Sequence, residues 1–239
     1  IPAYLQFILI FFALCKSKAL TEKVVLNQLL SKCNFSFTDE IIGNFISCCG
    51  DKVFQRRSLK IFFSKFDGKY ELSTKQWQQL MQCSADNAFD SEILEKFFID
   101  IEKNKIGIDL IEELLRCSDE NSFNEKILRC FLKKCNAEGL SLNAMKNLIK
   151  CCPNEIFVDH FSEILYKCHA KVFDNEFVSE VFKIKSIIFS EEVTLNFLKC
   201  CDKEIFDDKC YDNFKLKCEF SFSEKIILEL IHVSDKKTI

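Results

Sequence analysis

Five cysteines recur at a constant spacing of 34 residues, and this periodicity constrains the fold more than any local motif does. They are Cys15, Cys49, Cys83, Cys117 and Cys151. Self-similarity at a fixed period of roughly 20 to 50 residues is typical of chains that repeat one structural unit. The sequence therefore predicts a repeat protein with a 34-residue unit.

Apolar residues share the period of the cysteines. Three residues before each phased cysteine lies an apolar column that continues beyond the last of them, namely Phe12, Ile46, Leu80, Leu114, Leu148, Phe182 and Leu216. Further columns, four residues apart within each unit, follow the cysteines: Phe89, Phe123 and Phe157; Val25, Leu59, Ile93, Ile127 and Phe161; Leu29, Phe63, Phe97, Phe131 and Leu165. Residues four apart lie on one helical face. Each unit is therefore expected to hold two helices, the first ending near the phased cysteine.

Short polar breaks, such as residues 118–121 and 153–155, separate the two expected helices. Asp90 and Asn124 precede second helices and suit the N-cap position, where a side-chain oxygen accepts a bond from a free backbone N–H group. Only five Gly and two Pro occur in 239 residues, which favours helices with short connections.

The pattern covers the whole chain, so one domain over residues 1–239 is expected. Its units are residues 1–34, 35–68, 69–102, 103–136, 137–170, 171–203 and 204–239. A deletion in the sixth unit shifts the phase and puts Cys218 at the cysteine position of the seventh. Because one hairpin cannot bury both of its sides, neighbours must stack. The predicted fold is all-α, a right-handed α-solenoid of about seven two-helix repeats.

A 34-residue helical hairpin resembles the repeat of the tetratricopeptide class and, at one residue longer, that of the pentatricopeptide class. The resemblance covers the whole chain in period and architecture. The Trp, Leu-Gly and Tyr positions of the tetratricopeptide pattern do not recur, since Trp77 occurs once. Residues 121–143 place a Gly-Leu pair between a second helix and the next first helix, as the pentatricopeptide pattern does. The resemblance implies a solenoid and transfers no binding residues.

Fifteen cysteines, an odd number in a long chain, favour an intracellular reducing compartment over a disulfide framework. Neighbouring helices pack about 8 to 10 Å apart, farther than the roughly 7 Å between Cα atoms that a disulfide allows. The phased cysteines are therefore expected to be small, buried, reduced side chains. There is no Cys-x-x-Cys pair, and the three histidines do not lie at zinc-finger spacing, so no metal or cofactor is predicted.

No catalytic residue is predicted either. The chain has no Gly-rich phosphate loop, Gly-x-Ser-x-Gly elbow or His-Glu-x-x-His motif. His160 and His169 are expected on one helix, nine residues apart, where they form no compact site with Cys168. The chain is therefore expected to be non-enzymatic.

Polar positions two residues before and after the leucine column form the candidate partner-binding surface. They are Gln78, Gln82, Glu112, Arg116, Lys146 and Lys150. First helices commonly line the concave face of a solenoid. The mixed charges favour a protein partner, or a larger assembly, over a phosphate backbone, and a merely solvated face is the alternative.

The densest basic cluster is a candidate phosphate patch, formed by Lys52, Arg56, Arg57, Lys60 and Lys65 and called the Lys52 cluster below. The formal charge of −3 gives no global attraction to nucleic acid, so RNA binding would have to be local. An RNA-binding or ribonucleoprotein-associated repeat protein is therefore the alternative to a protein-binding scaffold.

Residues 3–14 are apolar almost all round, as in a fully buried helix. The stretch is shorter than the roughly 20 residues that cross a membrane. A signal peptide is the rival interpretation, although no basic segment precedes the stretch. We expect a first helix that is covered by a partner or by preceding sequence.

Overall fold

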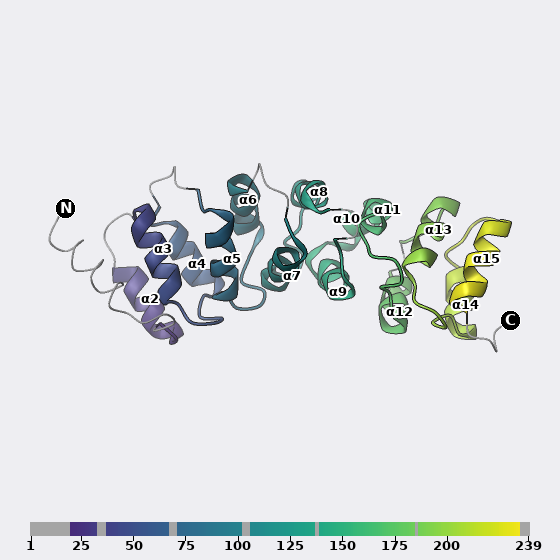
Figure 1. Ribbon diagram of the computed structural model, residues 1–239, viewed down its shortest axis with the longest axis horizontal. Coiled ribbons are helices and arrows are strands. Elements are labelled where there is room, and N and C mark those ends of the chain that lie inside the picture. The colour runs from purple at the N-terminus through teal and green to yellow at the C-terminus, as the bar shows by residue number, and fades with distance from the viewer. Residues whose placement is uncertain are drawn as a thin grey trace. The chain divides into compact units, whose positions relative to one another are not determined.

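The computed structural model describes residues 20–32, 37–66, 71–101, 106–136, 139–184 and 186–234. Within these residues the chain forms fourteen helices and no strand, which confirms the all-α prediction (Figure 1). None of these helices is long and apolar enough to span a membrane. The predicted helix at residues 3–14 and the first phased cysteine, Cys15, lie outside the described residues.

The chain divides into two compact units. The first comprises Ile1–Asn104 and Glu113–Ser122, and the second comprises Lys105–Glu112 and Phe123–Ile239. The helices of the first unit are α2 (Lys23–Lys32), α3 (Asp39–Cys48), α4 (Arg56–Phe63), α5 (Thr74–Gln82) and α6 (Ser91–Asp100). The boundary falls within α7 (Ile108–Cys117). The expectation of a single domain stays a prediction.

The second unit contains helices of similar length, apart from one position at which two short helices follow each other directly. Its helices are α8 (Glu125–Lys134), α9 (Leu142–Cys151), α10 (Asn154–Asp159), α11 (Phe161–Leu165), α12 (Asn175–Lys183), α13 (Glu191–Cys200), α14 (Asp208–Lys215) and α15 (Glu224–Val233). The 153–155 break predicted from the sequence is shorter in the structure, since α10 begins at Asn154.

Side-chain caps fix where the helices begin. The predicted caps are confirmed, because Asp90 accepts a hydrogen bond from the Ile93 N–H (3.2 Å) and Asn124 accepts one from the Ile127 N–H (2.9 Å). Each cap satisfies one of the backbone donors that a helix N-terminus leaves free. Ser141, Asp174, Ser190 and Asp207 cap α9, α12, α13 and α14 in the same way.

The apolar column before the phased cysteines lies in the core, where Ile46, Leu80, Leu114 and Leu148 are fully buried. The prediction of a buried residue is wrong for the last member of this column, because Leu216 is 81% exposed. Helix α14 ends at Lys215 and Leu216 follows it, so the buried Phe214 takes the core position instead. Val25, at the start of another column, is also exposed.

Phe89 and Phe123 were expected on a helical face, and the structure corrects this, since both lie two residues before a helix. The Phe89 N–H donates to the Cys117 carbonyl (2.7 Å), and the Phe89 carbonyl accepts from the Asp119 N–H (2.8 Å). Phe173 pairs in the same way with the segment after α13. An extended residue before one helix thus pairs with the segment after the next helix, which satisfies backbone groups that the helices leave free.

Alternate helices contact each other within each unit. In the first unit α2 contacts α4 and α3 contacts α5, whereas in the second α11 contacts α13, α12 contacts α14 and α13 contacts α15. The turns between helices repeat too, with a positive φ of 55° to 62° at Lys52, Asn87, Asn121, Lys171 and Glu204. Asn tolerates this left-handed conformation better than most residues, which suits it to two of these turns.

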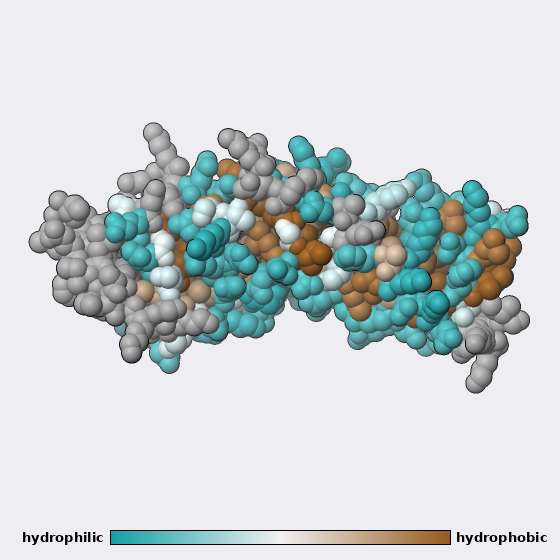
Figure 2. All heavy atoms as spheres, viewed as in Figure 1, coloured by the Kyte–Doolittle hydropathy of each residue, from teal (hydrophilic) through white to brown (hydrophobic). Residues whose placement is uncertain are grey.

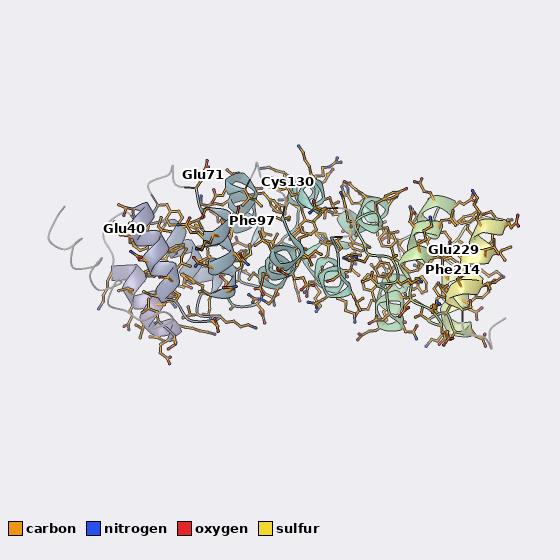
Figure 3. All side chains as sticks on the ribbon, viewed as in Figure 1. Glu40, Glu71, Phe97, Cys130, Phe214 and Glu229 are labelled. Carbon is orange, nitrogen blue, oxygen red and sulfur yellow. The ribbon has the colours of Figure 1, made fainter. Side chains whose placement is uncertain are left out.

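A buried carboxylate joins α5 to α6 in the first unit. Asp100 Oδ2 accepts hydrogen bonds from Trp77 Nε1 and from the Leu72 N–H, both at 3.0 Å. Lys96 Nζ lies 3.2 Å from Asp100 Oδ1, and the carboxylate is fully buried. The Trp77 ring packs against Phe97, which is labelled in Figure 3, with ring centroids 5.2 Å apart. Asp100 therefore fixes the start of α5 and the orientation of the indole.

Candidate partner-binding surfaces

The described phased cysteines, Cys49, Cys83, Cys117 and Cys151, are buried free thiols. Cys83 Sγ donates to the Cys49 carbonyl (3.4 Å), and Cys117 Sγ donates to the Met81 carbonyl (3.5 Å). Each of these thiols therefore contacts the end of the preceding first helix, where carbonyls lack an intrahelical partner. The sequence indicated the small size of these residues but not this hydrogen bond.

The cysteine environments favour thiols over thiolates. Burial raises the pKa of Cys117 to about 12, although the neighbouring Arg116 opposes this shift. Burial also raises the pKa of Cys210 to about 12 and that of Cys218 to about 11. A nucleophilic cysteine needs a lowered pKa, so these three thiols lack that feature.

The structure corrects one expectation about the histidines. Helix α11 ends at Leu165, so His169 lies beyond it, whereas His160 lies between α10 and α11. Among the residues that the structure describes, no cluster of three or more His, Cys, Asp or Glu side chains could hold a metal ion.

The six predicted partner-binding residues are distributed over both units. Gln78, Gln82 and Arg116 belong to the first unit, and Glu112, Lys146 and Lys150 belong to the second. Gln78, Gln82 and Lys150 are exposed, whereas the other three are half-buried and form polar contacts. Three of the six residues are therefore open to solvent, and the other three already have partners within the protein.

Arg116 is held by four groups of the first unit, which we call the Arg116 cluster. Its guanidinium donates to the carbonyls of Met81 (2.7 Å) and Ser84 (3.1 Å) and pairs with the carboxylates of Asp86 and Glu113. The hydrogen bond from Arg116 holds the pKa of Asp86 below its ordinary value, against the effect of burial. Arg116 thus stabilises the junction after α5 instead of presenting a free cation.

The two half-buried residues of the second unit also have partners. Lys146 Nζ contacts the carboxylates of Asp174 (3.2 Å) and Glu176 (2.5 Å) at the start of α12. Glu112 accepts a hydrogen bond from the hydroxyl of Ser141, the N-cap of α9. These contacts join neighbouring first helices.

Three members of the Lys52 cluster pair with carboxylates from turns and helix starts later in the chain. Lys52 pairs with Asp86 (3.1 Å). Arg56 pairs with Asp119. Lys60 pairs with Asp90 (2.8 Å) and with Glu92 (3.3 Å).

The two remaining members of the Lys52 cluster differ in exposure. Arg57 is exposed and forms no ion pair with the part of the chain that the structure describes, and Lys65 is half-buried. Neighbouring carboxylates offset the potential of a cationic patch, which weakens its attraction for phosphate.

A groove of about 460 Å³ lies between the first helices α12 and α14. Asn175, Ser179 and Lys183 line it from α12 at intervals of four residues, and Lys209 and Asn213 line it from α14. Phe182, Ile205, Cys210 and Asp207 complete the lining. Sequence reasoning missed this α12–α14 groove, although the polar stripe at a spacing of four residues was a readable signal.

A second cavity, of about 300 Å³, lies between the second helices α4 and α6. It is lined by Lys60, Phe63, Ser64, Glu92, Ile93 and Lys96. Both lysines already pair with carboxylates, Lys60 with Asp90 and Glu92, and Lys96 with Asp100. This cavity is therefore less suited to an anionic ligand than its lysines suggest.

Comparison with known proteins leaves the helical fold and these surfaces as the basis for assigning a function. No family model matches the chain, and neither the curated proteins nor the solved structures give a significant match.

Proposed function

We propose that this chain is a non-enzymatic helical-repeat scaffold, a right-handed solenoid of about seven two-helix repeats that binds a protein partner or serves as a subunit of a larger assembly. The contacts between alternate helices within each unit support the repeat. The recurring backbone pairing between a residue before one helix and the segment after the next helix supports it too. Buried free cysteines support an intracellular reducing compartment.

The α12–α14 groove is the observation that carries the protein-binding proposal. Asn175 and Asn213 can each donate and accept hydrogen bonds, as a polypeptide backbone also does. Lys183 and Lys209 flank the amides, and Phe182 adds an apolar contact. An extended peptide segment with acidic side chains would satisfy this combination of donors, acceptors and charges.

RNA binding is the competing function, and the Lys52 cluster is its basis. A phosphate backbone is bound through cations that release counterions, so affinity falls steeply with salt. Three of the five cations in the cluster already pair with carboxylates, which favours the protein-binding proposal.

Co-purification with variants of the 239-residue chain tests the proposal. The wild-type chain is expected to retain a defined protein after nuclease treatment, and Lys183→Glu/Lys209→Glu to lose it. Lys199→Glu/Lys225→Glu, which changes two exposed lysines of α13 and α15 outside the groove lining, is the matched control and is expected to retain the protein.

The two functions predict opposite results in a salt titration. Retention that survives nuclease and depends weakly on salt supports a protein partner. Nuclease-sensitive retention with a steep salt slope, lost in Arg56→Glu/Arg57→Glu and kept in Lys183→Glu/Lys209→Glu, would replace the proposal with RNA binding.

A further inference from the structure

The two helices that form the α12–α14 groove run side by side in the same direction, along the lower edge of the second unit in Figure 1. Their starts lie together, because Phe173, just before α12, pairs through its backbone with Cys200 and Asp202, from which a short turn leads into α14. Their ends lie together too, because Lys217, just after α14, donates from Nζ to the Ile184 carbonyl (2.7 Å), just after α12. Positions counted from the two N-caps can therefore be compared directly.

The two lysines of the groove lie near its opposite ends. Lys209 is two residues after Asp207, the N-cap of α14, whereas Lys183 is nine residues after Asp174, the N-cap of α12. At a rise of 1.5 Å per residue, this difference in position separates the two lysines by about 10 Å along the helix axes. Both lysines are exposed, and neither forms an ion pair with the residues that the structure describes. The groove therefore presents two separate cations.

Uncharged polar side chains lie between the two lysines. Ser179 is five residues after the N-cap of α12 and Asn213 is six residues after that of α14, so they lie at nearly the same level. Both are exposed, and Figure 2 shows a mainly hydrophilic surface over α12. The carboxylate in the lining, Asp207, already accepts the Cys210 N–H (2.7 Å). The middle of the groove thus offers hydrogen bonds without a charge.

We propose that the α12–α14 groove selects an extended segment with two acidic side chains three residues apart, at positions i and i+3. This inference rests on the proposed function and specifies the ligand of the same groove. In a polyproline II helix, three residues complete one turn and rise about 9 Å, so side chains i and i+3 share a face at the separation of the two lysines. Three residues of an α-helix rise only about 4.5 Å. In a β-strand, side chains three residues apart point to opposite faces.

The middle of the groove suits the backbone of such a segment. A polyproline II helix forms no internal hydrogen bonds, so its carbonyls are free to accept from the Ser179 hydroxyl and the Asn213 amide. Phe182 and Ile205 are buried and add apolar atoms to the lining, against which the residues between the two acids can pack. Spacing, donors and apolar contacts therefore agree on one kind of ligand.

Two synthetic peptides of identical composition test the spacing. One contains Glu-Pro-Pro-Glu and the other Glu-Glu-Pro-Pro, each between glycines, with an acetylated N-terminus and an amidated C-terminus so that only the glutamates are charged. The wild-type chain is expected to bind the first peptide about fivefold more tightly, because adjacent glutamates can reach only one lysine at a time. NMR titrations of the protein with the unlabelled peptides, at low ionic strength, measure both affinities.

Charge reversal tests which side chains read the two acids. Lys183→Glu and Lys209→Glu are each expected to lose the preference for Glu-Pro-Pro-Glu. One of these variants should instead prefer Lys-Pro-Pro-Glu, and the other should prefer Glu-Pro-Pro-Lys. Lys199→Glu/Lys225→Glu, at exposed positions outside the groove lining, is the matched control and is expected to keep the fivefold preference of the wild type.

The outcomes separate this inference from the proposed function. Equal affinity of the wild type for the two peptides, no binding of either, or loss of the preference in the control variant would each overturn the proposed spacing. If the co-purified protein were still lost in Lys183→Glu/Lys209→Glu, the proposed function would stand without that spacing. Retention of the co-purified protein in this double variant would overturn the proposed function itself.

Discussion

The side chains of Arg116 and Asp100 in the first unit are held by partners, whereas the polar side chains that α12 and α14 contribute to the groove of the second unit are exposed. In the first unit, Arg116 contacts two carbonyls and two carboxylates. Buried Asp100 accepts from an indole and a backbone N–H. In the second unit, Asn175 and Asn213 lie on the wall of a cavity.

This contrast shows that a polar residue on a first helix can have either of two roles, and that its neighbours decide which. Arg116 is structural because Asp86 and the end of α5 lie within hydrogen-bond distance of it. Buried polar groups cost stability when they lose a partner, while solvated ones cost little. Substitutions in the two regions should therefore affect different properties, stability in the first and binding in the second.

The largest effect is expected for Asp100→Ala in the first unit. The substitution leaves the Trp77 indole N–H and the Leu72 N–H without their buried acceptor, so unfolding should become easier by about 3 kcal/mol. Guanidinium unfolding measures this loss. Asp100→Asn keeps an acceptor oxygen and is expected to lose less. An Asp100→Ala chain as stable as the wild type would show that this carboxylate does not stabilise the unit.

Arg116→Ala is expected to have the next largest effect. It removes the donors to the Met81 and Ser84 carbonyls from a side chain that is 23% exposed, so a loss of about 1 to 2 kcal/mol is expected. Arg116→Lys should recover only part of it, because an ammonium lacks the planar fork of donors. Lys150→Ala, at an exposed position, is the control in urea unfolding. Equal losses of unfolding free energy in Arg116→Ala and Lys150→Ala would contradict the distinction between polar residues that have partners in the protein and those that are exposed to solvent.

A smaller effect is expected on acidification. Arg116 lowers the pKa of Asp86, and the bonds from Lys60 and the Ile93 N–H lower that of Asp90 despite its burial. Because the folded-state pKa lies below the unfolded one, this stabilisation is complete at neutral pH and is lost as the pH falls below about 4. Unfolding free energies measured between about pH 6 and pH 3 should decline less steeply for Asp86→Asn. If the unfolding free energy of Asp86→Asn declined with falling pH as steeply as that of the wild type, Asp86 would not contribute to the loss of stability in acid.

The smallest effect on stability is expected in the α12–α14 groove. Ser179→Ala and Asn213→Ala remove polar groups from an open wall, so unfolding free energies should stay within about 0.5 kcal/mol of the wild type. Affinity for the co-purified protein should fall several-fold in the same variants, as titration calorimetry would measure. A large loss of stability with unchanged affinity would show that these groove residues have a structural role, as Arg116 and Asp100 do in the first unit, and not a binding role.

Much of the helical pattern could be predicted because it depends on local chemistry. The caps Asp90 and Asn124 and the buried Leu80 and Leu114 follow from spacing and residue type alone. The prediction was wrong at Phe89, which pairs through its backbone with a segment almost thirty residues away. It was also wrong at Leu216, because the end of α14 moved the core position to Phe214.

The candidate sites were less predictable than the helices. The six first-helix residues were chosen by register, which specifies a helical face but not the neighbour of that face. Arg116 and Lys146 proved to have carboxylate partners about thirty residues away, and the α12–α14 groove was not predicted. Separations this large lie beyond the reach of helical spacing.

The sequence by itself determined that this protein is helical, where α6 and α8 begin, and which residues of each helix are apolar. These properties depend on contacts within a few residues along the chain. Only the tertiary structure decided which thiols donate across to a preceding helix, which charges are already paired, and that Ile227 of α15 is exposed. Those properties depend on groups that the fold brings together from distant parts of the chain, and helical periodicity carries no information about them.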